Sequence, residues 1–69
     1  MIMQIGIVAG DIWHYLDING TEKLSRLTLA TGKPRDLVLM SLGWLAREGH
    51  VVLKGEGDYE IFLRQKEVV

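Results

Sequence analysis

Few side chains in this sequence have the types and spacing that enzyme chemistry requires. His14 and His50 belong to different predicted elements, and the chain has no cysteine, so no recognisable set of metal ligands is present. Ser25 and Ser41 lack the Gly-x-Ser-x-Gly setting of an activated hydroxyl. We therefore expect no catalytic residue, no metal and no cofactor.

Basic side chains are the better candidates for a chemical role, because they can contact nucleic acid. Arginine can pair with guanine through two hydrogen bonds, whereas lysine mostly meets phosphate. Each basic residue alone is more typical of a solvated surface position than of a DNA contact, and the acidic Asp36, Glu56 and Asp58 oppose phosphate binding. The interpretation depends on a fold that gathers Lys33, Arg35 and Lys54 on one side. The predicted DNA-binding residues are Lys23, Lys33, Arg35, Arg47 and Lys54.

Hydrophobic periodicity predicts helices that position these residues. Apolar residues recur every three or four positions from Ile5 to Ile18, which indicates a first helix that ends at Asn19-Gly20. Thr21 is a suitable N-cap for a second helix, whose inner face is Leu24, Leu27 and Ala30. Thr31-Gly32 ends that helix.

A third helix and a hairpin complete the chain. Pro34 suits the first position of a helix, so we predict a helix over about 34–48 that ends at Gly49. Val51–Leu53 and Tyr59–Leu63 are β-prone runs around a turn with two glycines. This order predicts one domain over residues 1–69, mainly α with a small β-hairpin, namely a winged helix-turn-helix of three helices and a C-terminal wing. The alternative is a three-helix bundle with an unrelated β tail.

The third helix carries more apolar residues than one core requires. Val38, Leu42 and Leu45 form its core stripe, with Leu39 and Ala46 beside it. Leu37, Met40 and Trp44 project elsewhere. Either the second helix and the hairpin cover them, or Met40 and Trp44 lie in a subunit interface.

The first helix contains two glycines one turn apart, Gly6 and Gly10, on a face shared with Trp13, His14 and Asp17. Each glycine costs about 1 kcal/mol relative to alanine inside a helix. Either they allow close approach of another chain, or Gly6 marks a later helix start and Gly10 packs under an internal aromatic. We predict a homodimer whose interface includes Gly6, Gly10, Trp13, Met40 and Trp44.

Length and charge agree with this interpretation. A chain of 69 residues buries a limited share of its surface, which favours a second subunit. The net charge is −1, so DNA binding must rely on a local patch rather than a global field. The sequence shows neither a signal peptide nor a membrane-spanning run, and we expect a cytoplasmic location and no membrane partner.

Two stretches resemble a small prokaryotic family of winged helix-turn-helix domains, most of them without an assigned function. The first combines Ile5-Gly6, Ala9–Trp13 and Leu16, and the second is Ser41–Gly49. With Thr31-Gly32 and the terminal hairpin, the resemblance covers nearly the whole chain. It implies the fold and, by fold analogy alone, DNA as a partner. Two functions remain open: a DNA-binding domain that regulates transcription, and a winged-helix protein-interaction module that does not bind DNA.

Overall fold

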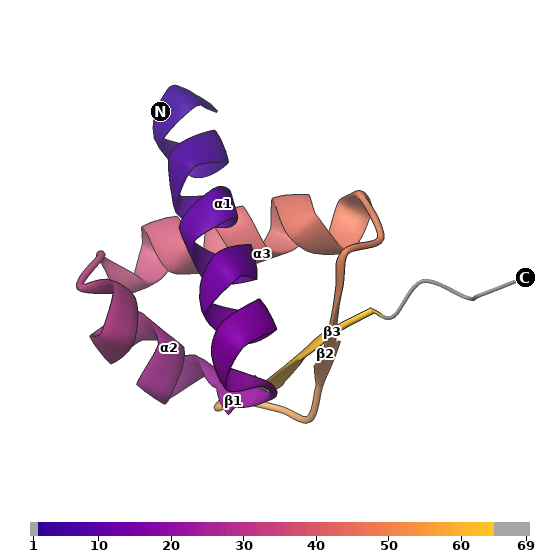
Figure 1. The fold of residues 1–69 in the computed structure, drawn as a ribbon. Coiled ribbons are helices and arrows are strands. Elements are labelled where there is room, and N and C mark those ends of the chain that lie inside the picture. The colour runs from indigo at the N-terminus through magenta and orange to yellow at the C-terminus, as the bar shows by residue number, and fades with distance from the viewer. Residues whose placement is uncertain (1, 65–69) are drawn as a thin grey trace, which may run out of the picture.

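Residues 2–64 are described by the computed structural model, in which three helices pack with a small sheet (Figure 1). The fold is a mainly helical winged helix-turn-helix, as the sequence predicted. In chain order the elements are α1 (Ile2–Asn19), β1 (Glu22–Lys23), α2 (Leu24–Thr31), α3 (Arg35–Arg47), β2 (Val51–Lys54) and β3 (Glu60–Leu63).

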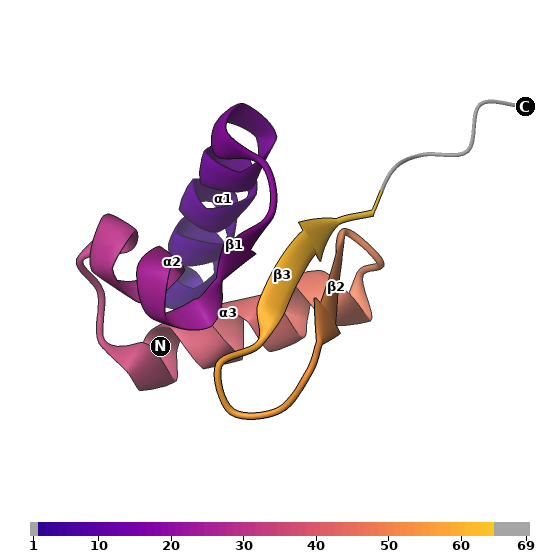
Figure 2. The same ribbon diagram turned by 90° about the horizontal axis from the view of Figure 1, so that it is seen from below.

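The sheet is antiparallel with the order β1-β3-β2 (Figure 2). The predicted hairpin is present as β2 and β3, which we call the wing together with their connecting loop. The two-residue strand β1 was not predicted, and the prediction that Thr21 caps the second helix was wrong. Glu22 pairs with Ile61 instead, so the segment is extended and α2 begins only at Leu24.

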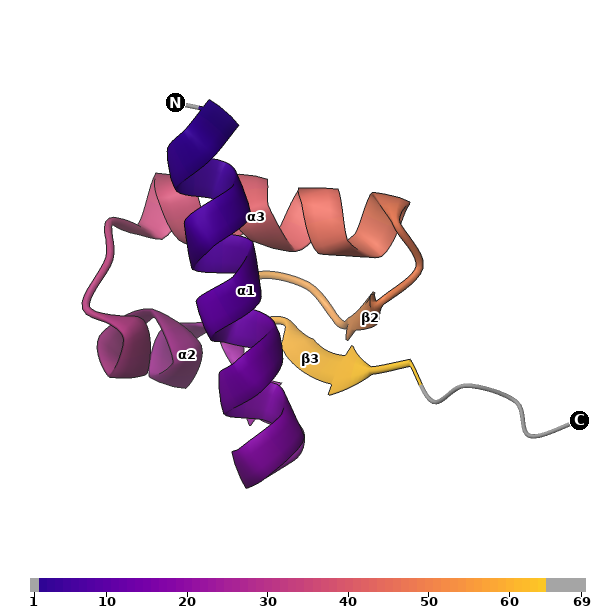
Figure 3. The same cartoon turned by 45° about the horizontal axis from the view of Figure 1, so that its top comes forward.

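The core lies between α1 and α3, which cross each other, with α2 and the sheet closing its sides (Figure 3). The three- and four-residue spacing of apolar positions in the helices explains which faces are buried. Two alanines that we expected to face the core, Ala30 and Ala46, are exposed. The buried apolar residues are Val8, Ala9, Ile12, Leu16, Leu24, Leu27, Val38, Leu42, Leu45, Val51 and Ile61.

Glycine with a left-handed backbone ends α2, as expected from the sequence. Gly32 has φ 67° and donates its N–H to the carbonyl oxygen of Thr28, a conformation that L side chains rarely adopt. The following Pro34 precedes the first residue of α3 rather than occupying it. The short turn between α2 and α3 thereby fixes the helix-turn-helix pair.

The structure decides two alternatives that the sequence left open. Met40 and Trp44 remain 39% and 53% exposed, so α2 and the wing do not cover them. Gly6 lies well inside α1, which begins at Ile2, so Gly6 does not mark the helix start. A Cβ placed on Gly10 meets no atom within 4 Å among residues 2–64 outside its own stretch of helix backbone, and Gly10 is therefore not packed under an aromatic side chain.

Candidate nucleic-acid interface

The sheet register places two of the predicted DNA-binding residues at the same level of the sheet, on either side of one residue of the middle strand. Glu60 of β3 pairs with Lys23 on one side and with Lys54 on the other. Because paired residues in neighbouring strands point to the same face of a sheet, the two lysines flank one carboxylate on the exposed face. The ammonium of Lys54 also lies 5.3 Å from the centre of the Phe62 ring, a cation–π contact that directs this side chain along the wing.

Asp58 joins the wing to the start of α2. Its Oδ1 accepts a hydrogen bond of 2.8 Å from the backbone N–H of Ser25, and its Oδ2 accepts one of 2.8 Å from the Ser25 hydroxyl. The N–H of Leu24 donates to the Tyr59 carbonyl beside it. The wing thus supplies the N-terminal cap that the residues just before α2 do not supply.

Two basic residues, Lys23 and Arg35, act on the carboxyl group of Asp58. The two hydrogen bonds from Ser25 lower the pKa of the Asp58 carboxyl, and the positive charges of Lys23 and Arg35 lower it further. Arg35, the first residue of α3, acts on the Asp58 carboxyl through its charge, more weakly than Lys23 does. We call the resulting group, at the loop end of the wing, the wing-loop cluster: Lys23, Arg35, Lys54, Asp58 and Glu60.

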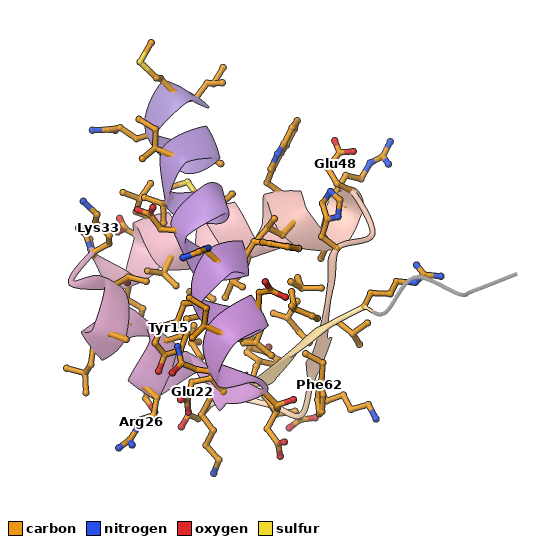
Figure 4. All side chains as sticks on the ribbon, viewed as in Figure 1. Tyr15, Glu22, Arg26, Lys33, Glu48 and Phe62 are labelled. Carbon is orange, nitrogen blue, oxygen red and sulfur yellow. The ribbon has the colours of Figure 1, made fainter. Side chains whose placement is uncertain are left out.

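The remaining two predicted DNA-binding residues lie outside the wing-loop cluster. Lys33 is in the turn before α3, at one end of the molecule in Figure 4. Arg47 is the last residue of α3, about 18 Å along the helix axis from Arg35 at 1.5 Å per residue. The structure thus adds Lys23 to the expected pair Arg35 and Lys54, leaves Lys33 in the turn two residues before Arg35, and separates Arg47 from them.

The exposed face of α3 offers few groups that can read a base edge. Asp36, Met40, Gly43 and Arg47 recur at three- and four-residue spacing opposite the buried stripe, and all four are exposed. Of these, Arg47 is the side chain suited to a hydrogen bond with guanine. The face is therefore better suited to lying against DNA than to reading its sequence.

A second surface, between α1 and the end of α3, contains the residues predicted for a dimer interface. A shallow groove is lined there by Gly6, Gly10 and Trp13 of α1 and by Trp44 of α3. Trp13 is 41% exposed. Met40 lies one helical turn before Trp44, so the predicted residues from the two helices are close together.

The phenol of Tyr15 fixes the position of β1 against α1 on the side away from this groove. Its hydroxyl donates to Oε2 of Glu22 over 3.1 Å, and both side chains are labelled in Figure 4. This hydrogen bond, followed by partial desolvation, raises the pKa of Tyr15. Glu22, the residue before Lys23 in β1, is thus held in a structural contact.

Within residues 2–64, no cluster of three or more histidines and carboxylates has the arrangement of a metal site. In the same part of the chain, none of the helices is long and apolar enough to cross a membrane.

Comparison with known proteins gives one match. Residues 1–65 match a family described as "Winged helix-turn-helix domain (DUF2582)". Neither the curated proteins nor the solved structures gave a match.

Proposed function

Because the chain belongs to the winged helix-turn-helix domain family DUF2582, we propose that it is a non-enzymatic DNA-binding domain that regulates transcription as a homodimer. Such a protein acts where the chromosome is, which in a prokaryotic cell is the cytoplasm. The fold supports this proposal because winged helix-turn-helix domains commonly bind DNA through the second helix of the pair and the wing.

The observation that carries the proposal is the convergence of Lys23, Arg35 and Lys54 at the loop end of the wing. Lys23 lies in β1 immediately before α2, Arg35 is the first residue of α3, and Lys54 is the last residue of β2. In helix-turn-helix proteins the second helix of the pair contacts base edges with its N-terminal residues, and Arg35 lies at that end of α3. Asp58 belongs to the same cluster, but both of its oxygens accept hydrogen bonds from Ser25. Its structural role as a cap accounts for an acidic residue at this position.

The binding that we propose is weak and mainly electrostatic. Glu60 and Asp58 offset part of the positive charge, and α3 presents Met40 and Gly43 where a sequence-reading helix usually carries polar side chains. Three phosphate contacts per protomer correspond to a slope of about −2.7 in log affinity against log salt concentration. Two protomers that present the same cluster together gain affinity through effective concentration.

The test is the affinity for a mixed-sequence DNA duplex, measured by fluorescence anisotropy at several salt concentrations. Replacing both Lys23 and Arg35 by alanine is expected to reduce the salt slope by about 2 per protomer. The control is Arg26→Ala, which removes a positive charge near Tyr15 and is expected to leave the slope close to that of the parent. If the double variant binds like the parent at equal salt, the wing-loop cluster is not the DNA-binding surface.

A protein-interaction module is the second candidate, favoured by the exposure of Met40 and Trp44 on the helix that would otherwise face DNA. Exposed apolar side chains grouped on one surface commonly mark a protein interface. The same titration separates the two functions. If the parent chain has no measurable affinity for duplex DNA at low salt, the DNA-binding proposal fails and the interaction module replaces it.

A further inference from the structure

We infer that two copies of this chain pair through antiparallel packing of α1 against α1, with Gly6 of each copy facing Gly10 of the partner subunit. This inference rests on the proposed homodimer and specifies its geometry. In this arrangement Met3 faces Trp13 of the partner subunit. The two-fold axis passes between the helices at the level of Val8.

The helix α1 has a second stripe of residues with the spacing of a packing surface. Met3, Gly6, Gly10, Trp13 and Asp17 follow one another at spacings of three and four residues, beside the stripe that packs against the core. All five are exposed. Alternating spacings of three and four are typical of a helix surface that packs along a second helix. We call these residues the outer face of α1.

The outer face of α1 is complementary to the same face of a second copy that runs in the opposite direction. Residues equally far before and after Val8 face each other across a two-fold axis, which sets glycine against glycine at the centre and methionine against tryptophan at each end. Two glycines allow the helix backbones to approach closely at the crossing point. A thioether beside an indole ring is a favourable contact. A two-fold interface requires this self-complementarity.

The first turns of α1 project beyond the rest of the protomer. They extend past α3, as Figures 1 and 3 show, and Ile2 and Met3 are 87% and 79% exposed. The two-fold axis places this apolar end beside Trp13 of the partner subunit, at the groove that Trp13 and Trp44 line in each copy. Each copy thus supplies both the projecting end and the groove that receives it.

The available apolar area fits an interface of ordinary size. The exposed parts of Trp13, Trp44, Ile2, Met3 and Ile7 amount together to on the order of 600 Å² per copy, against about 800 Å² per partner in a stable complex. Met3 and Trp13 of the outer face supply roughly two fifths of this area, and the neighbouring Ile2 and Ile7 of α1 and Trp44 of α3 supply the rest.

The charges of α1 also suit the antiparallel orientation. The first turn, Ile2–Ile5, contains no acidic residue to balance the positive end of the helix dipole. In the proposed register Asp17 lies just beyond this turn of the partner subunit's α1. A parallel arrangement would instead bring the two Asp17 carboxylates together, where they repel each other.

Disulfide cross-linking tests the orientation directly, because the chain has no cysteine of its own. Met3→Cys and Trp13→Cys are prepared as separate variants, mixed and oxidised. We expect a disulfide between the two different variants and little cross-linking of either variant alone. In the antiparallel arrangement the two copies of position 3 are about 15 Å apart along the helix axes, too far for a disulfide.

The outcomes separate this inference from the proposed function. Cross-linking of each variant with itself, but not with the other, indicates parallel helices and overturns the inference. A dimer in sedimentation equilibrium without any cross-link overturns the α1 pairing but leaves the homodimer. A mass near 7.8 kDa at micromolar concentration overturns the pairing, while a parallel DNA titration still decides the proposed function.

Discussion

Replacing Gly10 by leucine tests the outer face of α1 against a matched position elsewhere in the chain. Gly43 is the matched position, since it is also an exposed glycine inside a helix. A Cβ placed on either residue meets no atom within 4 Å among the described residues outside its own stretch of helix. Both positions therefore have room for a Cβ, both glycines are exposed, and the two variants differ in the surface that they change.

The expected magnitudes follow from this geometry. Each substitution removes a helix-interior glycine, which stabilises the folded protomer by roughly 0.8 kcal/mol and raises Tm by about 4–6 °C in a domain of this size. At the crossing point of α1 with α1, each leucine side chain costs about 1–3 kcal/mol by overpacking. Because the two-fold axis repeats the contact, Kd for dimerisation rises at least about 30-fold for Gly10→Leu. Gly43→Leu leaves it unchanged.

Sedimentation equilibrium and thermal unfolding measure both effects. We expect Gly10→Leu to be a folded monomer with unperturbed circular dichroism. We expect Gly43→Leu to remain a dimer, and to bind DNA less tightly because the leucine side chain projects from the exposed face of α3. If Gly10→Leu remains as dimeric as the parent, the reasoning about the outer face is wrong.

Three further predictions concern the core, the wing and the tryptophans. Leu42→Ala removes a fully buried side chain and is expected to cost 2–5 kcal/mol in urea unfolding. The lowered pKa of Asp58 means that its carboxylate stabilises the fold above the ordinary aspartate pKa, and that this contribution is lost as pH falls through the lowered value. Asp58→Asn should therefore weaken the pH dependence of unfolding below about pH 4, and an unchanged acid profile contradicts the cap. Trp13 and Trp44 are partly exposed in the protomer, so their fluorescence should shift to shorter wavelength as concentration rises through dimerisation, and a spectrum independent of concentration speaks against their burial.

The helices and the hairpin could be predicted because their signals are local. The stripe that includes Ile12 and Leu16 identified α1, and the alternation around Ile61 identified β3. The strand β1 could not be predicted in this way. Glu22 and Lys23 have no strand preference, and they are extended because the backbone of β3 pairs with them.

The candidate site was predictable in its residue types but not in its arrangement. Lys23 and Lys54 are far apart in the sequence, and only the order β1-β3-β2 sets them on either side of Glu60. The cap that Asp58 provides to Ser25 spans 33 positions. We predicted that Asp58 would oppose DNA binding. Its role as a cap could not be predicted, because its hydrogen-bond donors come from Ser25 in a distant element.

The exposed apolar surface was the part of the site that periodicity located best. The helical positions of Met40, Trp44 and Trp13 placed them outside the core stripes, and all three are partly exposed. The sequence could not show that Trp13 and Trp44 line one groove, because that depends on how α1 crosses α3.

Titration of isotope-labelled protein with a mixed-sequence DNA duplex, followed by amide chemical shifts, tests the central claim most directly. We expect the amide chemical shifts around the wing-loop cluster to change as DNA is added at low salt, namely those of Lys23, Ser25, Arg35 and Lys54. The amide shifts of Gly6 and Gly10 should stay constant. Raising the salt concentration should reverse the changes. Changes confined to the outer face of α1, or none at all, would contradict the assignment of the wing-loop cluster as a DNA-binding surface.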